Sequence, residues 1–517
     1  MKLLQLHFAW VLLLLVVFGT GCQKFDKLED LELSERDAEY AVPVFRTSTS
    51  LQDVLEEFDS NTVVQIQSDG SMLLNYRGKV TARTSQEIFE ITNEITSAPL
   101  IITDTFMALP FAIPNGIDID YAILKGGSIQ ILWQANHKED ISLKVSVLSL
   151  LTPEGEVFTK TYDADYAGNT MEPIMNYIDS EISLDGYIVR PDQDSLYVSY
   201  ELIRKSTGLR DTVSGMILLI EDLNASYMEG YLGGDIYEMD RDTIEIDFFE
   251  NWTRGDVYFA DPKIRLTVEN SFGFPVRSKA NLVEVLTVDG DRLPLRSTFI
   301  DDGINVDYPG LDEIGEVKVT NFAFDKTNSN VDSILAAGPI AVDYDFDAVP
   351  NPDQDTTIRG FITDTSSLRA LVEVDLPVFG STAGFAVNDT FDADFVQFDE
   401  VEYAEFKLVT ENEIPLEVAV QLYFADPAGQ IIDSLFERSV QVIEGAPVDA
   451  EGNAIDVVKK ETFIRFDEAR FNRIRQSDKI YMTAAFSTTN NGMSIVKVLS
   501  SQKTNIRMGM KVGLKED

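Results

Sequence analysis

Cysteine and histidine are almost missing from this chain of 517 residues, which contains one cysteine and two histidines. The cysteine is Cys22, and His7 stands in the apolar run before it, so His137 is the one imidazole in the rest of the sequence. A Ser-His-Asp or Cys-His catalytic arrangement needs a histidine beside a free nucleophile, and a zinc site needs several His or Cys ligands close together. Neither pattern is present, and one cysteine permits no disulfide within the chain. The sequence therefore predicts a protein that is not an enzyme and whose cores depend on apolar packing.

Basic residues are also scarce, because 42 Lys and Arg stand against 87 Asp and Glu, which gives a formal net charge of −45. The acidic excess runs along the whole chain, and such a field repels nucleic acid and anionic membrane surfaces. We therefore expect neither as a direct partner. The hydrophobic content of 44% and the aromatic content of 10% are normal for a packed globular chain. At roughly 150 residues per domain, the length favours three domains.

Residues 1–21 have the pattern of a secretory signal peptide. Lys2 precedes an uncharged apolar core from Phe8 to Phe18, and small residues follow this core. The apolar run is shorter than the stretch of about 20 residues that a membrane-spanning helix needs. Cleavage between Gly21 and Cys22 is predicted to release a mature chain without this segment.

Gly19-Thr20-Gly21-Cys22 resembles the lipobox of bacterial lipoproteins, with Gly19 at the position that usually holds Leu, Val or Ile. The resemblance implies a diacylglyceryl thioether on Cys22, and two or three acyl chains make a durable membrane anchor. Gln23 stands where Asp marks inner-membrane retention in enteric bacteria, which favours the outer membrane. Residues 22–40 are polar and acidic and are predicted to form a tether. Whether the anchored chain faces the periplasm or the cell surface stays open.

A pattern of two alternating strands recurs three times along the chain. In each copy an apolar strand ends in an asparagine, at Asn136, Asn270 and Asn412, and a second alternating strand follows. Period-two alternation bounded by Gly, Pro, Asn or Asp is typical of antiparallel strands with one buried face. Asparagine suits the end of such a strand because its side chain can bond its own backbone in a turn. The sequence thus predicts a mainly β protein with three tandem Ig-like antiparallel β-sandwich domains and a small N-terminal α/β lead-in.

The register of the repeat gives the predicted domain boundaries. We expect the lead-in at 41–97 and the three sandwiches at 98–230, 231–356 and 357–517. The stretch 343–357 is rich in Asp and Pro, which favours a linker.

Several shorter elements have local signals of their own. Ser50-Leu51-Gln52-Asp53 resembles a capping box and predicts a helix start, and Asp69-Gly70 predicts a hairpin turn. Short helices are also predicted at 171–182 and 466–476.

Three pairs of aspartates are the candidate metal ligands, since Ca²⁺ binds oxygens from closely spaced carboxylates and carbonyls. The pairs are Asp192 with Asp194, Asp240 with Asp242, and Asp353 with Asp355. None has the spacing of an EF-hand loop. We expect solvated turns and no cofactor, with bound calcium as the alternative.

Glycan binding needs an exposed planar aromatic side chain. Beyond Cys22 the chain has two tryptophans, of which Trp133 stands in a repeat strand and is predicted to be in a core. Trp252 is predicted to lie in a loop and is the ligand candidate. The segment Phe272-Gly273-Phe274-Pro275 is predicted to pack against its own sandwich. A glycoside hydrolase needs only two carboxylates, but nothing in the sequence distinguishes one pair among 87 acidic residues.

The lipobox, the acidic sandwiches and the missing catalytic imidazole together resemble the large uncharacterised multidomain lipoproteins of Bacteroidota. Gly230-Tyr231-Leu232-Gly233 and Val374-Asp375-Leu376-Pro377 are among the segments that carry this resemblance. It implies an outer-membrane lipoprotein of tandem domains, with no assigned reaction. We expect a lipid-anchored, non-catalytic scaffold or accessory subunit whose partner is a protein such as an outer-membrane β-barrel. The alternative is a glycan-binding surface lipoprotein of the starch-utilisation accessory type, and the third hypothesis is a carboxylate-based glycoside hydrolase.

Overall fold

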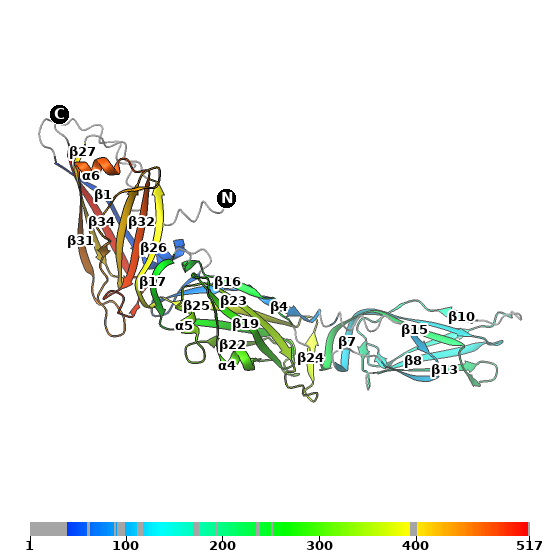
Figure 1. Ribbon diagram of the computed structural model, residues 1–517. Coiled ribbons are helices and arrows are strands. Elements are labelled where there is room, and N and C mark those ends of the chain that lie inside the picture. Colours follow the sequence, from blue (N-terminus) through cyan, green and yellow to red (C-terminus); the bar gives the residue numbers. More distant parts are fainter. Residues whose placement is uncertain are drawn as a thin grey trace.

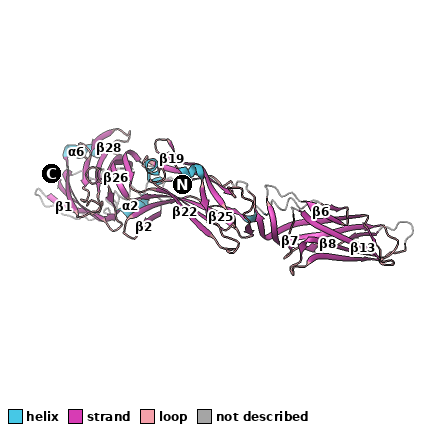
Figure 2. Cartoon of the chain, turned by 90° about the horizontal axis from the view of Figure 1, so that it is seen from below, coloured by secondary structure: helices cyan, strands magenta, loops and turns pink. Residues whose placement is uncertain are grey.

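The computed structural model describes residues 39–58, 63–86, 89, 99–110, 117–168, 175–192, 195–233, 238–249, 252–392 and 401–514. Strands make up 60% of the described residues and helices 7%, which confirms the prediction of a mainly β, antiparallel protein. Figure 1 shows three β bodies that follow one another in an elongated, bent row, and Figure 2 shows the same row from below. We name them the tip module, the middle module and the terminal module. Among the described residues, no helix has the length and apolar character needed to cross a membrane.

The tip module is built on a sheet of 12 strands, one of which, β24 (Gly360–Thr363), comes from a distant part of the chain. The other strands are β5 (Leu100–Ile102), β6 (Phe106–Pro110), β7 (Asp118–Ala135), β8 (Ile141–Leu151), β9 (Val157–Ala164), β10 (Met175–Ile178), β11 (Ile182–Ser183), β12 (Ile188–Val189), β13 (Ser195–Arg204), β14 (Arg210–Asp211) and β15 (Gly215–Tyr231). The long strands β7 and β15 pair with each other, with register shifts around Asn224 that bend the ribbon. Alternate residues of β7, among them Ile129, Ile131 and Trp133, are buried in the core of this module.

The middle module is a sandwich of two sheets. One sheet contains β2 (Val63–Ile66), β3 (Met72–Arg77), β4 (Thr81–Thr84), β18 (Lys263–Asn270), β22 (Lys318–Phe324) and β25 (Ser367–Pro377). The other contains β16 (Asp242–Glu245), β19 (Val276–Thr287), β20 (Arg292–Pro294), β21 (Ile304–Val306) and β23 (Pro339–Pro350). Three short helical elements accompany them: η3 (Asp247–Phe249), α4 (Thr298–Asp302) and α5 (Val331–Leu335). Leu266 and Val374 of the first sheet pack with Val285 and Val342 of the second in one core.

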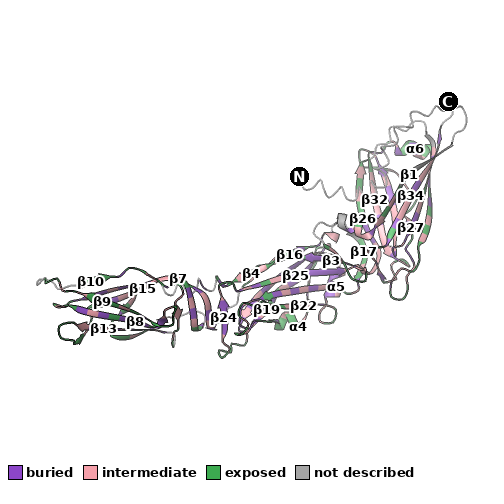
Figure 3. Cartoon of the chain, turned by 180° about the vertical axis from the view of Figure 1, so that it is seen from behind, coloured by how far each residue is buried: buried purple, intermediate pink, exposed green. Residues whose placement is uncertain are grey.

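The terminal module is a second sandwich and holds both the first and the last described strand. One sheet contains β1 (Glu39–Ser50), β34 (Lys503–Leu514), β27 (Val401–Asn412) and β31 (Val458–Asp467). The other contains β17 (Trp252–Phe259), β26 (Phe379–Asp392), β28 (Leu416–Ala425), β29 (Ile431–Ser434), β30 (Val440–Ile443), β32 (Lys479–Thr488) and β33 (Val496–Lys497). The helices α2 (Leu51–Phe58) and α6 (Glu468–Ile474) complete it. Figure 3 shows buried and exposed residues alternating along the strands, as expected for sheets with one covered face.

Strand pairing does not follow the order of the chain. From the predicted lead-in, β1 pairs with β34 in the terminal module, whereas β2, β3 and β4 belong to the middle module. The chain also leaves the middle module at β17, which pairs with β26, and returns at β18. From the third predicted sandwich, β24 joins the tip-module sheet and β25 the middle module. The predicted boundaries therefore separate strands that the structure pairs, because pairing between distant segments leaves no trace in a local alternation pattern.

The asparagine at the end of the repeat strand forms the same corner in two modules. Asn270 is 0% exposed, and its side-chain oxygen accepts a hydrogen bond from Phe272 N at 3.0 Å. Asn412 is 1% exposed and accepts from Ile414 N, also at 3.0 Å. In both modules the next strand lies in the opposite sheet, so the asparagine fixes the crossing from one sheet to the other. Asn136 is exposed, and β8 stays in the same sheet as β7.

The local predictions have mixed outcomes. The capping box is confirmed, because Asp53 Oδ2 accepts from Ser50 N at 2.9 Å and Ser50 Oγ accepts from Asp53 N at 3.1 Å, at the start of α2. The hairpin around Gly70 is confirmed by the β2–β3 pairing, with φ +84° at the glycine. Helix α6 confirms the helix predicted at 466–476. The helix predicted at 171–182 is wrong where the structure describes it, since β10 and β11 occupy that region and pair with β7.

The linker predicted at 343–357 is wrong over its first half, which is the central strand β23. Tyr344, Phe346 and Ala348 point into the core and are buried. The acidic residues between them face outward, and Asp343 is paired there with Arg241 and Arg292. The aspartates on one face of this strand thus made its composition resemble that of a linker, although the residues on the other face are apolar.

Candidate functional site

Several predicted site residues lie outside the described part of the chain. These are Gly21 and Cys22 at the predicted cleavage and lipidation site, and Asp194 of the first aspartate pair. Trp252 is the first residue of β17, where its backbone pairs with Val387, but the structure does not describe its side chain. Lipidation of Cys22 and ligand binding by Trp252 stay predictions.

The described aspartates of the three candidate pairs do not converge on a common point. Asp242 accepts hydrogen bonds from Lys79 N at 2.8 Å and from the Tyr344 hydroxyl at 3.1 Å. Asp355 accepts from Thr357 N at 2.9 Å in a turn. Asp353 pairs with Arg277 at 3.4 Å, while Asp192 forms a backbone bridge with Ser195. Asp240 is exposed.

Within the described residues, no three His, Cys, Asp or Glu side chains are grouped as a metal ion would need. The pKa of Asp355 is lowered by its hydrogen bonds to Thr357, and the pKa of Asp242 is lowered by the backbone N–H of Lys79 against the opposing effect of burial. These bonds give the carboxylates local roles in turns and strand contacts. Calcium binding stays an untested alternative.

A cluster of aromatic side chains lies near the outer end of the tip module, where β10 pairs with the last residues of β7. Trp133 is 3% exposed, which agrees with the predicted core role. Tyr177 stacks on it with ring centroids 5.5 Å apart and an interplanar angle of 18°, and is itself 40% exposed. The Trp133 indole nitrogen is buried and has no hydrogen-bond partner among the described residues. Tyr177 is therefore an aromatic surface supported from beneath by a second ring, and it belongs to β10, a segment predicted from sequence to be helical.

The same cluster contains a buried carboxylate. The Tyr162 hydroxyl donates to Asp179 Oδ2 at 2.7 Å, and the Lys160 amine lies 3.8 Å from the same oxygen. Burial, and then this bond to Asp179, raises the pKa of Tyr162. The tyrosine is thus held as a neutral hydrogen-bond donor that stabilises the carboxylate.

The one histidine of the described chain lies at the same end of the tip module, beside β14. His137 Nε2 is 3.1 Å from Asp211 Oδ2, and Arg204 also pairs with Asp211 and lies 3.5 Å from Glu139. The Arg204 guanidinium lowers the pKa of Asp211 to about 2, with further help from Thr212 N and His137. The arrangement is a network of ion pairs that ties the loop after β7 to the β13–β14 turn.

A pair of buried carboxylates that the sequence did not single out lies on the outer face of the middle module. Glu373 and Asp375 are 5% and 6% exposed and both belong to β25. Arg265 reaches both, with Nε 2.5 Å from Asp375 and Nη1 3.1 Å from Glu373, and Arg77 Nε donates to Glu373 at 2.8 Å. Asn75 donates to Asp375 at 2.8 Å.

A glycoside hydrolase needs one carboxyl group that keeps a proton for the leaving group. Arg265 pairs with both carboxylates and Arg77 pairs with Glu373, and the bond to Asp375 raises the pKa of Arg265. The geometry is that of a structural ion-pair network, not of an acid and a base set apart for catalysis.

Comparison with known proteins gives no family for this chain. No family model and no curated protein matches it. Among solved structures, it is similar to a "putative secreted protein" from Parabacteroides distasonis at 12% identity, covering 92% of this chain and 100% of that one, with a TM-score of 0.28. It is also similar to VP2 of infectious bursal disease virus in a subviral particle, at 8% identity over 93% of this chain and 82% of that one, with a TM-score of 0.16. At such scores these likenesses establish neither a shared fold nor a shared function.

Proposed function

We propose that this chain is a lipid-anchored, non-catalytic scaffold or accessory protein of the bacterial outer membrane. The observation that carries the proposal is the place of β1, the first described strand. It pairs along its length with β34, from Glu39 opposite Gly513 to Ser50 opposite Lys503, in the terminal module. Figure 1 shows this module at the end of the row opposite to the tip module. An anchor on Cys22 would therefore hold the terminal module nearest to the bilayer and leave the tip module farthest away.

This arrangement suits presentation of a binding surface at a distance from the membrane. The three modules form one row, and charged contacts support the joint between tip and middle modules. Arg359 pairs with Asp118 and Asp120, and Lys125 pairs with Asp364 at 3.1 Å. The net charge of −45 disfavours nucleic acid and anionic lipid surfaces, so the proposed partner is a protein. It would belong to an outer-membrane complex, such as that of a β-barrel, and have a part that extends from the bilayer as far as the tip module.

The anchor is tested by metabolic labelling with a palmitate analogue, followed by membrane fractionation and mass spectrometry of the N-terminal peptide. We expect the wild-type chain to carry label and to sediment with outer membranes, and the Cys22→Ala chain to lack label. A bare Cys22 thiol in a protein recovered from the aqueous fraction would contradict the proposal.

The orientation and the partner need separate measurements. Protease treatment of intact cells, with a periplasmic protein as control, distinguishes the cell surface from the periplasmic face. Cross-linking from Tyr177→Cys at the tip should capture the partner more efficiently than cross-linking from Phe463→Cys, whose side chain is 57% exposed in the terminal module. Equal capture at both positions would refute presentation by the tip.

A second function, glycan binding at the tip, is favoured by one observation. Tyr177 offers a partly exposed ring backed by Trp133, and such rings stack on sugar faces. On a glycan array, Tyr177→Ala should abolish saturable binding and Phe463→Ala should leave it unchanged. Trp252→Ala tests the site predicted from sequence. Binding that survives all three substitutions would exclude both aromatic sites.

A further inference from the structure

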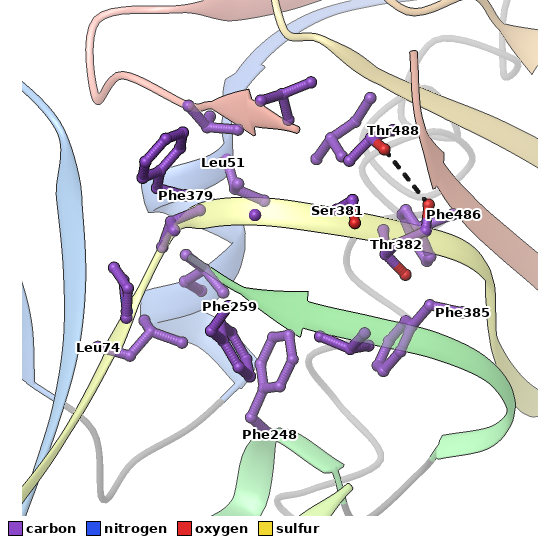
Figure 4. A pocket seen from close by; sticks show the side chains of 18 of the residues that line it. Leu51, Leu74, Phe248, Phe259, Phe379, Ser381, Thr382, Phe385, Phe486 and Thr488 are labelled. Carbon is purple, nitrogen blue, oxygen red and sulfur yellow. Dashed lines mark hydrogen bonds between the residues drawn. The ribbon is translucent and has the colours of Figure 1, made fainter. Parts of the chain in front are cut away.

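An apolar cavity of about 180 Å³ lies where the middle and terminal modules meet. Figure 4 shows Leu51, Leu74, Phe248, Phe259, Phe379 and Phe385 around it. These side chains come from α2, β3, η3, β17 and β26, so they belong to segments far apart in the sequence. The size matters because an engineered apolar cavity of about 150 Å³ stays dry and binds benzene.

The walls of the cavity are the segments by which the chain crosses between the two modules. Helix α2 connects β1 of the terminal module to the β2 side of the middle module. The 3-10 turn η3 precedes β17, and Pro377 and Val378 connect β25 to β26. A molecule in the cavity would therefore contact all three crossings at once.

Two of the hydroxyl groups on the wall already make hydrogen bonds within the protein. The Thr488 hydroxyl donates to Ser494 O at 2.8 Å, and the Thr382 hydroxyl donates to Asp256 O at 2.8 Å. Asp247 is the one carboxylate among the described residues that line the cavity. The wall thus offers van der Waals contact and the exclusion of water. It favours binding of a ligand that brings no polar group into the cavity.

We propose that this cavity binds a single unbranched alkyl chain and that its occupation stiffens the joint between the middle and terminal modules. Two sources share this chemistry: an acyl chain carried by Cys22, and free lipid. The first is within reach, because the 17 residues from Cys22 to Glu39 span up to roughly 60 Å when extended. Strand β1, which leads directly into α2, is 12 residues long, or roughly 40 Å. The site itself does not depend on lipidation, which is the anchor of the proposed function.

The test uses the full-length Cys22→Ala chain and a series of linear alcohols from hexanol to hexadecanol, measured by displacement of Nile red. Each buried methylene should tighten binding about fourfold, until the cavity is full and the gain stops. Hydrogen exchange in α2 and β17 should slow when dodecanol binds. Dodecanol that fails to bind, or an affinity that is independent of chain length, would overturn the proposal.

Cavity-filling variants locate the site. Val257→Phe and Val378→Phe each place a ring in the cavity from a different crossing, and each should weaken dodecanol binding at least tenfold. Val189→Phe is the matched control, because Val189 lines a separate cavity of about 110 Å³ in the tip module. Circular dichroism checks that each variant folds. Unchanged binding in both joint variants, or loss only in Val189→Phe, would refute the assignment.

The source of the alkyl chain follows from comparing lipidated wild-type protein with the Cys22→Ala chain. If only Cys22→Ala binds dodecanol, the acyl chain on Cys22 occupies the cavity in the wild type. If both bind it, free lipid is the ligand. Binding by Cys22→Ala supports the site even if mass spectrometry shows that Cys22 is never acylated, so the two proposals fail independently.

Discussion

The asparagine corners provide a graded test of what holds the sandwiches together. Asn412 donates to the carbonyls of Ile414, Leu416 and Glu444 at 2.7, 3.1 and 2.9 Å, and it accepts from Ile414 N and the Thr504 hydroxyl. Replacing it with alanine leaves several buried polar groups without their partner. At about 1–3 kcal/mol for each group that stays unsatisfied, we expect Asn412→Ala to cost roughly 3–5 kcal/mol.

The other two repeat asparagines, Asn270 and Asn136, serve as internal controls with smaller expected effects. Asn270 makes two such bonds, to Asp307 O at 3.1 Å and from Phe272 N at 3.0 Å, so Asn270→Ala should cost about 1–3 kcal/mol. Asn136 is exposed, and Asn136→Ala should change stability by less than about 0.5 kcal/mol.

Hydrogen exchange with peptide resolution is the suitable assay, because a chain of several modules need not unfold in one step. Asn412→Ala should accelerate exchange in β27, β28 and β34, and Asn270→Ala in β18 and β25. Destabilisation by Asn136→Ala as large as that by Asn412→Ala would refute the reasoning. The loss of stability would then not depend on the number of buried side-chain hydrogen bonds that each asparagine makes.

Three further outcomes are expected. Ser50→Ala removes the cap of α2 and should cost about 1 kcal/mol, measured as faster amide exchange in the first turn of that helix. The pKa of Asp211 is lowered to about 2, so its stabilising effect should be complete above its unfolded pKa of about 4 and disappear as the pH falls toward 2. Acid titration of the tip module should show this loss in the wild type, and Asp211→Asn should lack it. Arg265→Ala leaves Glu373 and Asp375 buried with fewer cations and should cost about 3–5 kcal/mol, measured as faster amide exchange in β18 and β25. A triple Arg265→Met, Glu373→Gln, Asp375→Asn chain should recover part of that loss.

The elements that sequence reasoning found are those whose signal is local. The alternation of Ile129, Ile131 and Trp133 placed them on the buried face of a strand, and the reciprocal bonds of Ser50 and Asp53 begin α2 as predicted. The segment from Phe272 to Phe274 packs into the core, as expected for a chain turning against its own sandwich.

The errors have physical causes as well. Residues 343–350 contain three aspartates on one face, and this acidic composition predicts a linker. Tyr344 and Phe346 alternate with the aspartates and are buried, and their burial stabilises the segment as a strand. The segment at 175–178 was assigned to a helix, but pairing with β7 made it a strand, because a free sheet edge outweighs a weak helical preference.

The candidate sites were less accessible to sequence reasoning than the strands. Each candidate site combines residues from strands that are separated in the chain. This holds for the stack of Tyr177 on Trp133, the pair of Glu373 and Asp375 with Arg265, and the cavity at the joint. One weak signal was present, since Glu373 and Asp375 alternate with the apolar residues Val374 and Leu376 of the same strand.

By itself, the sequence determined that the chain forms antiparallel strands with one buried face, and it located two of the corners where the chain crosses between sheets. The tertiary structure alone decided that β1 pairs with β34, that β17 crosses into the terminal module, and that a cavity remains where those crossings meet. The physical reason is range. Alternation and capping are set by neighbours a few residues away, whereas the choice of strand partners depends on which apolar faces can be buried together across hundreds of residues.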